Sequence, residues 1–178
     1  MDISRSPIHV LLNDCAGSYE SGATREIIER ELRDAGREYR IIGLHPGPEL
    51  SREILEAVTQ AEAAGAVVVA AGGDGTLNAV AQAVFGRNMP FGILPQGTFN
   101  YFGREHGISQ ELPVALKQLL TGKVRPVQVE LVNGRVFSFW STPASGCIRF
   151  FWKTGKRSRP IWAATVWWPC WRRSTRCS

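Results

Sequence analysis

The chain has 178 residues, 44% of them hydrophobic, and a formal net charge of +5. This length suffices for one domain with a substantial core, and no apolar run is long enough to span a bilayer as a helix. The N-terminus has an acidic residue at position 2 and only a short apolar stretch, so we predict no signal peptide and expect a cytoplasmic location.

Two compositions are joined end to end. Through Phe137 the chain has 13 Lys and Arg against 16 Asp and Glu, whereas the last 41 residues have 8 Lys and Arg, no acid and all six tryptophans. The four cysteines form no C-x-x-C pair, so neither a zinc site nor a disulfide framework is supported. We therefore expect a globular domain over residues 8–137 and treat 138–178 as a separate basic, Trp-rich tail.

Strands and amphipathic helices alternate along the first part of the chain. Short apolar runs predict strands, and apolar residues three and four apart predict helices. The expected elements are, in chain order, a strand at 8–12, a helix at 22–36, a strand at 38–44, a helix at 48–65, a strand at 66–71, a helix after a glycine loop at 77–84, a strand at 89–95, a helix at 111–123 and two strands within 125–139 around an Asn-Gly turn. This order predicts an α/β fold, a doubly wound and mostly parallel sheet with helices on both faces.

The loop Gly-Gly-Asp-Gly-Thr follows the third strand and precedes a helix. In an open parallel sheet, ligands bind beyond the carboxyl ends of the strands. Gly72, Gly73 and Gly75 allow backbone N–H groups to approach an anion, and the helix N-terminus favours phosphate. Thr76 suits a helix cap or a phosphate contact.

Asp74 is the unusual member of this loop. A carboxylate beside a phosphate is repelled unless a cation lies between them or the carboxylate acts as a base. Magnesium held partly by an aspartate is the usual arrangement in phosphoryl transfer. The alternative is a helix-capping turn in which Asp74 only favours the positive end of the helix.

A second glycine–threonine loop follows the fourth strand. Gly97, Thr98 and Asn100 occur in the stretch ILPQGTFN. Because carboxyl ends of parallel strands meet at one edge of the sheet, we expect the two loops to lie together. A pair of such loops is much more specific for a phosphate site than either alone.

The motifs GGDGTLN, ILPQGTFN and FGREHGI together resemble the diacylglycerol kinase catalytic domain family, which includes bacterial lipid kinases and sphingosine kinases. The N-terminal stretch LLNDCAG is similar to that family's first nucleotide motif, Asn-Pro-x-Ser-Gly, with departures at Asp14 and Ala16. Further departures are Ala79, where the family often has Glu, and Tyr101, where it often has Asp.

The resemblance implies an ATP-dependent lipid kinase that phosphorylates diacylglycerol or a similar alcohol at a membrane surface. It implies that ATP lies between the loops and that Asp74 either helps to hold Mg²⁺ or takes the proton from the lipid hydroxyl. The residues expected to bind the nucleotide are Asn13, Gly17, Gly72, Gly73, Asp74, Gly75, Thr76, Asn78, Gly97 and Thr98. NAD kinase shares GGDGT but lacks a match to LPQGTFN, so an NAD kinase-like enzyme ranks second.

The family has a second, β-rich domain, and the sequence after Phe137 does not resemble it. We therefore expect that domain to be missing, and we interpret residues 138–178 as a frameshifted tail that begins between about Val136 and Cys147. Membrane contact by this tail is the main alternative, and no nucleic-acid partner is expected. A chain without the second domain could be a non-catalytic ATP-binding fragment, and its exposed sheet edge could support a homodimer. The lipid substrate implies a peripheral position at the inner membrane face.

Overall fold

The computed structural model describes residues 3, 5–13, 21–132, 135–138 and 146–152. From the first strand to the fourth, strands and helices alternate in the predicted order. They are β1 (Ile8–Asn13), α1 (Ser21–Asp34), β2 (Tyr39–Leu44), α2 (Leu50–Ala63), β3 (Val67–Gly72), α3 (Asp74–Val84), β4 (Phe91–Pro95), α4 (Tyr101–Glu105), α5 (Leu112–Leu120), β5 (Lys123–Val132), β6 (Arg135–Ser138) and β7 (Gly146–Trp152).

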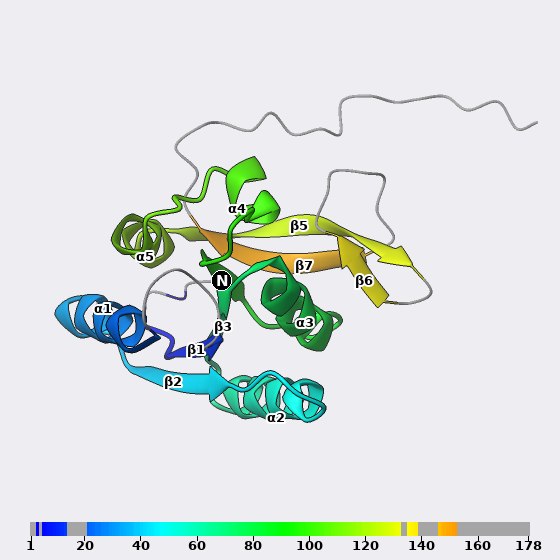
Figure 1. Cartoon of the computed structure of the whole chain (residues 1–178), viewed down its shortest axis with the longest axis horizontal. Helices are drawn as coiled ribbons and strands as arrows, with labels where there is room; N and C mark the ends of the chain where they lie inside the picture. Colours follow the sequence, from blue (N-terminus) through cyan, green and yellow to red (C-terminus); the bar gives the residue numbers. More distant parts are fainter. Residues whose placement is uncertain (1–2, 4, 14–20, 133–134, 139–145, 153–178) are drawn as a thin grey trace, which may run out of the picture.

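The strands form one sheet in the order β2-β1-β3-β4-β7-β5-β6 (Figure 1). Strands β1 to β4 are parallel to their neighbours, and β7 continues this direction beside β4. Strand β5 runs antiparallel to both β7 and β6. The prediction of a mostly parallel, doubly wound sheet is confirmed.

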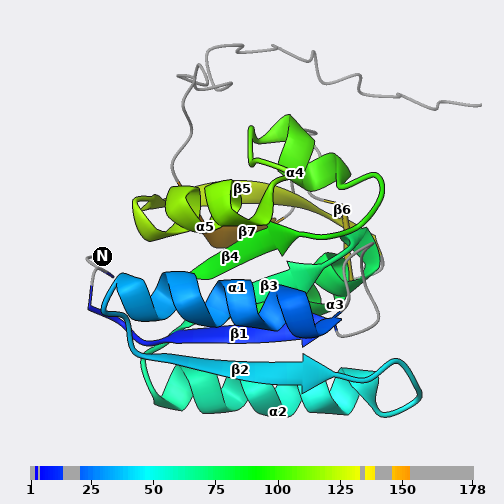
Figure 2. The same cartoon turned by 60° about the vertical axis from the view of Figure 1, so that its left-hand side comes forward.

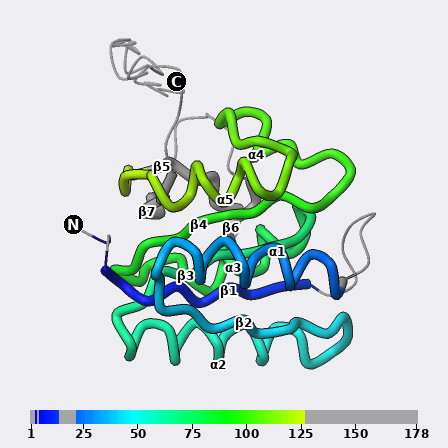
Figure 3. The backbone as a smooth tube through the Cα atoms, turned by 90° about the vertical axis from the view of Figure 1, so that its left-hand side faces the viewer, coloured from blue at the N-terminus to red at the C-terminus, as the bar shows by residue number. Residues whose placement is uncertain are grey.

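Helices cover both faces of the sheet. Helices α1 and α5 lie on one face, and α2 and α3 lie on the other (Figures 1 and 3). The central strand β3 is buried along its whole length because it has a helical layer on each side. Arg87, which follows α3, pairs with Glu62 of α2 and donates to Thr59 Oγ1 at 3.3 Å. This contact joins the two helices at the surface.

Two elements were not expected from the sequence. The short helix α4 packs on the end of β4. The contact is close, since a Cβ added to Gly103 would lie 3.0 Å from Cγ of Pro95. Strand β7 lies between β4 and β5 although it follows both in the chain. Strand β7 belongs to the predicted tail 138–178 and nevertheless pairs with β4 and β5, whereas residues 139–145 and 153–178 lie outside the described part. The boundary at 137 and the displaced reading frame stay predictions.

Within the part of the chain that the structure describes, no helix has both the length and the apolar character that crossing a membrane requires.

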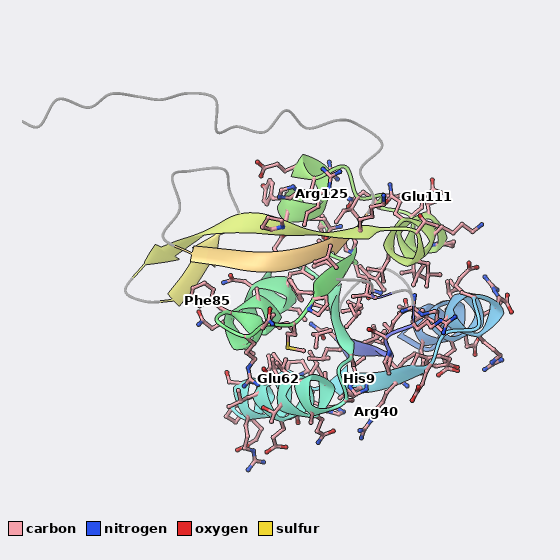
Figure 4. All side chains as sticks on the ribbon, turned by 180° about the vertical axis from the view of Figure 1, so that it is seen from behind. His9, Arg40, Glu62, Phe85, Glu111 and Arg125 are labelled. Carbon is pink, nitrogen blue, oxygen red and sulfur yellow. The ribbon has the colours of Figure 1, made fainter. Side chains whose placement is uncertain are left out.

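His9 is buried in β1 and faces a polar neighbour on the edge strand. Its side chain is 8% exposed, and its Nδ1 atom has no hydrogen-bond partner among the described residues. Arg40 is its register partner on β2, and both residues are labelled in Figure 4. Burial lowers the pKa of His9 below its ordinary value of 6.5, and Arg40 lowers it further, whereas Glu38 opposes the shift.

The pKa of His9 makes the folding stability depend on pH. A lowered folded-state pKa means that the unfolded chain takes up the proton first as the pH falls. The contribution of neutral His9 is therefore present above about pH 6.5 and is lost as the pH falls through the lower folded-state pKa. We expect His9→Gln to lose less stability than the unaltered chain between neutral and mildly acidic pH, measured by urea unfolding at several pH values. The same dependence of the unfolding free energy on pH in the two proteins would contradict this prediction.

Candidate functional site

The sheet order creates a switch point between β1 and β3. The chain leaves β1 for β2 on one side and returns to β3 on the other side, with α1 and α2 on opposite faces (Figure 2). Connections that diverge in this way leave a crevice at the carboxyl ends of the two strands. Asn13 is the last residue of β1 and Gly72 is the last residue of β3. Both lie at this point.

A side-chain hydrogen bond spans the switch point. Asn13 Nδ2 donates to Thr76 Oγ1 at 2.8 Å. Thr76 is buried in the first turn of α3, and Asn13 is half-buried. Two predicted site residues that are 63 positions apart therefore meet. Gly17, which was predicted to lie with them, is outside the described residues.

The first glycine loop leads directly into the N-terminus of α3. Gly73 is the residue before the helix and has an extended backbone with ψ 176°. The first helical hydrogen bond runs from Leu77 N–H to Gly73 C=O at 3.0 Å. The N–H groups of Asp74, Gly75 and Thr76 precede this bond and have no acceptor within the helix. This end of α3 is therefore suited to bind an anion.

The three glycines of this loop serve different purposes. A Cβ on Gly72 would lie 2.8 Å from Cβ of Thr76, so this glycine allows the helix to turn back onto the strand. A Cβ on Gly75 would meet nothing within 4 Å, and the residue is exposed. Gly75 is therefore the position at which a ligand has room to approach the backbone.

The second glycine loop touches the first, as expected. Gln96 N–H donates to Gly72 C=O at 2.9 Å. A Cβ on Gly97 would lie only 2.8 Å from Cα of Gly73 and 2.9 Å from Oδ1 of Asn100. The two backbones can approach this closely because position 97 is glycine, whereas a Cβ on Gly73 would lie 3.4 Å from Cα of Gly97, an ordinary contact distance.

Asn100 holds the second loop in shape. It has a left-handed backbone (φ 47°, ψ 48°) and is 4% exposed. Its Oδ1 accepts from Gly97 N–H at 2.7 Å, and its Nδ2 donates to Gly97 C=O and to Gln110 Oε1, both at 2.6 Å. Asn100 is thus a structural residue of the loop, while the predicted Thr98 beside it is exposed.

Two polar side chains at the site have buried atoms that lack partners among the described residues. They are Oδ1 of Asn78 and both amide atoms of Gln96. Asp74 and Asn78 are one turn apart on α3 and share a face of that helix. Unpaired buried amides such as these can hydrogen-bond a ligand. Gln96 was not among the predicted site residues, although a polar residue between a buried strand and a glycine could have indicated a binding site.

Asp74 contributes a half-buried carboxylate to this edge of the sheet. Among the described residues no group of three or more His, Cys, Asp or Glu side chains could hold a metal ion. Mg²⁺ keeps several waters and needs only one or two carboxylates when substrate phosphates complete its shell. One carboxylate beside an open anion site therefore fits a magnesium–phosphate complex.

Comparisons with known proteins identify the family of the chain. Residues 7–132 match the family model described as diacylglycerol kinase catalytic domain. The chain is 34% identical over 125 residues to the diacylglycerol kinase of Staphylococcus aureus (strain NCTC 8325 / PS 47), covering 67% of the chain and 40% of that protein. It is 46% identical over 70 residues to a probable lipid kinase YegS-like of Klebsiella pneumoniae (strain 342), covering 38% of the chain and 24% of that protein.

A solved structure supports the fold. A putative diacylglycerol kinase from Bacillus anthracis str. Sterne superposes with a TM-score of 0.67 at 22% identity, over 77% of this chain and 50% of the other. The chain spans less than half the length of the curated relatives described above.

The glycine contact can be tested by adding one methyl group. We expect Gly97→Ala to lower the free energy of unfolding by about 1–3 kcal/mol, because the new Cβ would collide with the backbone of Gly73. Gly75→Ala is the matched control, since its Cβ would meet nothing within 4 Å. We expect the control to leave stability unchanged or to raise it by up to about 1 kcal/mol. Equal destabilisation of both variants in urea unfolding would contradict the contact.

Proposed function

Because the chain belongs to the diacylglycerol kinase catalytic domain family, we propose that it binds ATP at the carboxyl ends of β1, β3 and β4 and transfers the γ-phosphate to the hydroxyl of diacylglycerol or a similar lipid. The observation that carries the proposal is the meeting of three strand ends around the N-terminus of α3. The Asn13–Thr76 hydrogen bond and the Gly73–Gly97 contact hold them together.

The phosphates are proposed to lie over the start of α3. Three N–H groups of residues 74–76 face outward from the helix end, and the absence of a side chain at Gly75 leaves space beside them. The helix N-terminus favours the negative charge of the phosphates. Asn78, Gln96 and the exposed Thr98 supply polar groups around this position.

Asp74 is proposed as the residue that matters most for transfer. With Mg²⁺ bound, the metal would neutralise the charge that develops on the transferring phosphate. Asp74 would hold the ion through its carboxylate, or it would accept the proton of the lipid hydroxyl. In either role the protein mainly positions the two reactants, and little covalent chemistry is required of it.

A second candidate is an ATP-binding chain that does not transfer phosphate. It is favoured by the coverage, since the chain spans 40% of the Staphylococcus aureus kinase. Tyr101 also replaces the Asp that the second loop often has in the family. ATP binding measured by calorimetry, beside transfer to diacylglycerol in mixed micelles, separates the two candidates: binding with transfer supports the kinase, and binding alone supports the second candidate.

The role of Asp74 can be tested by removing only its charge. We expect Asp74→Asn to lower the rate of phosphate transfer at least about 100-fold while the urea midpoint stays unchanged. Asp34→Asn is the matched control, because Asp34 is an exposed carboxylate at the end of α1. A fall in Mg·ATP affinity would identify Asp74 as a metal ligand, and an unchanged affinity would identify it as the base. Full activity of Asp74→Asn would rule out both roles.

A further inference from the structure

Two aromatic side chains stand out from the second glycine loop into solvent. Phe99 is 61% exposed and Tyr101 is 52% exposed. Their rings stack with centroids 5.5 Å apart and planes 1° from parallel. Large apolar side chains that gather at one exposed place mark an interaction site more often than single ones do.

The backbone explains why both rings point outward. Asn100 lies between them, is buried, and has the left-handed conformation fixed by its three hydrogen bonds. This turn directs the residues on either side away from the core. The rings are therefore presented by an ordered loop, so little conformational entropy would be lost when a partner covers them.

Cationic side chains lie at the same end of the molecule. Arg104 follows Tyr101 by one helical turn and is exposed. Helix α4 and strand β5 lie at the end opposite α2 in all three backbone views, and Figure 4 labels Arg125 of β5 at that end of the molecule. Lys123 is also exposed and lies on the same face of β5, two residues earlier.

Charge is unevenly distributed over residues 1–126. Residues 99–126 carry four Lys or Arg and two Asp or Glu, whereas residues 1–98 carry eight and thirteen. The two acids in the first set are Glu105 and Glu111. An anionic surface would therefore attract residues 99–126 and repel residues 1–98.

We propose that Phe99, Tyr101, Arg104 and Arg125, here called the α4 surface, dock the chain on an anionic lipid bilayer. The proposal rests on the proposed function for its choice of a lipid partner. Aromatic rings partition into the interface between headgroups and acyl chains, and Arg side chains bind anionic headgroups beside them. The docked loop continues directly into Gly97, so the phosphate site would lie close to the membrane.

A single-stranded nucleic acid is the other polymer that binds aromatic and basic side chains. The stacking of Phe99 on Tyr101 already covers one face of each ring. A base needs a free ring face, whereas insertion into a bilayer uses the ring edges as well. Together with the lipid substrate of the proposed function, this difference favours the bilayer.

The test is sedimentation of the full chain with phosphatidylcholine vesicles, with and without phosphatidylglycerol, in the absence of ATP. We expect the double variant Phe99→Ser/Tyr101→Ser to lose at least about tenfold in vesicle affinity. Leu55→Ser is the matched control, because Leu55 is 49% exposed on α2 at the opposite end. Arg104→Gln/Arg125→Gln should weaken binding only to vesicles that contain phosphatidylglycerol, and Arg52→Gln should not.

A second measurement needs no variant. Vesicles should protect the amides of residues 99–105 from hydrogen exchange in the unaltered chain. The proposal is overturned if that chain does not bind vesicles, if the aromatic variant binds as tightly as Leu55→Ser, or if a single-stranded oligonucleotide protects 99–105 and vesicles do not. Since docking is measured without ATP, a chain that docks but transfers no phosphate would contradict only the proposed kinase activity.

Discussion

The close approach of Gly73 to Gly97 is the constraint on which the rest of the site depends. Parallel pairing of β3 with β4 places their carboxyl ends side by side, with Gly72 opposite Pro95. The loops that follow β3 and β4 must therefore share a small space. Only glycine allows one loop to rest on the other, because a Cβ at Gly97 would lie 2.8 Å from the neighbouring Cα.

The remaining polar contacts fix this arrangement from two sides. On one side, Asn13 bonds Thr76 and ties the end of β1 to the first turn of α3. On the other side, Asn100 and Gln110 hold the second loop against the segment that leads to α5. Several side chains of the phosphate motifs are therefore occupied with each other. The groups left for a ligand are backbone N–H groups, the amides of Asn78 and Gln96 and the carboxylate of Asp74. This set suits a phosphate with a cation between it and the carboxylate.

Much of this could be predicted from the sequence because the signals are local. The apolar run before Gly72 identifies a strand covered on both faces, and two Gly-Thr loops after neighbouring parallel strands must meet. Other features depend on contacts that spacing does not reveal. Helix α4 is too short to show periodicity, and the position of β7 between β4 and β5 reverses the chain order. Gly72 has a packing role that the sequence does not reveal, since its missing side chain makes room for Thr76; its role toward a ligand stays a prediction.

The left-handed turn at Asn100 has a mechanical consequence. It joins Gly97, which rests on the first loop, to Phe99 and Tyr101, which face solvent, within five residues or at most about 17 Å. This segment is short, and the Asn100 side chain holds it with three hydrogen bonds. We therefore expect it to move as one rigid unit. A partner that binds the rings therefore contacts the same short segment that packs on the first glycine loop. If that partner changes the affinity for a nucleotide at the loops, thermodynamic reciprocity requires the nucleotide to change the affinity for the partner by the same factor.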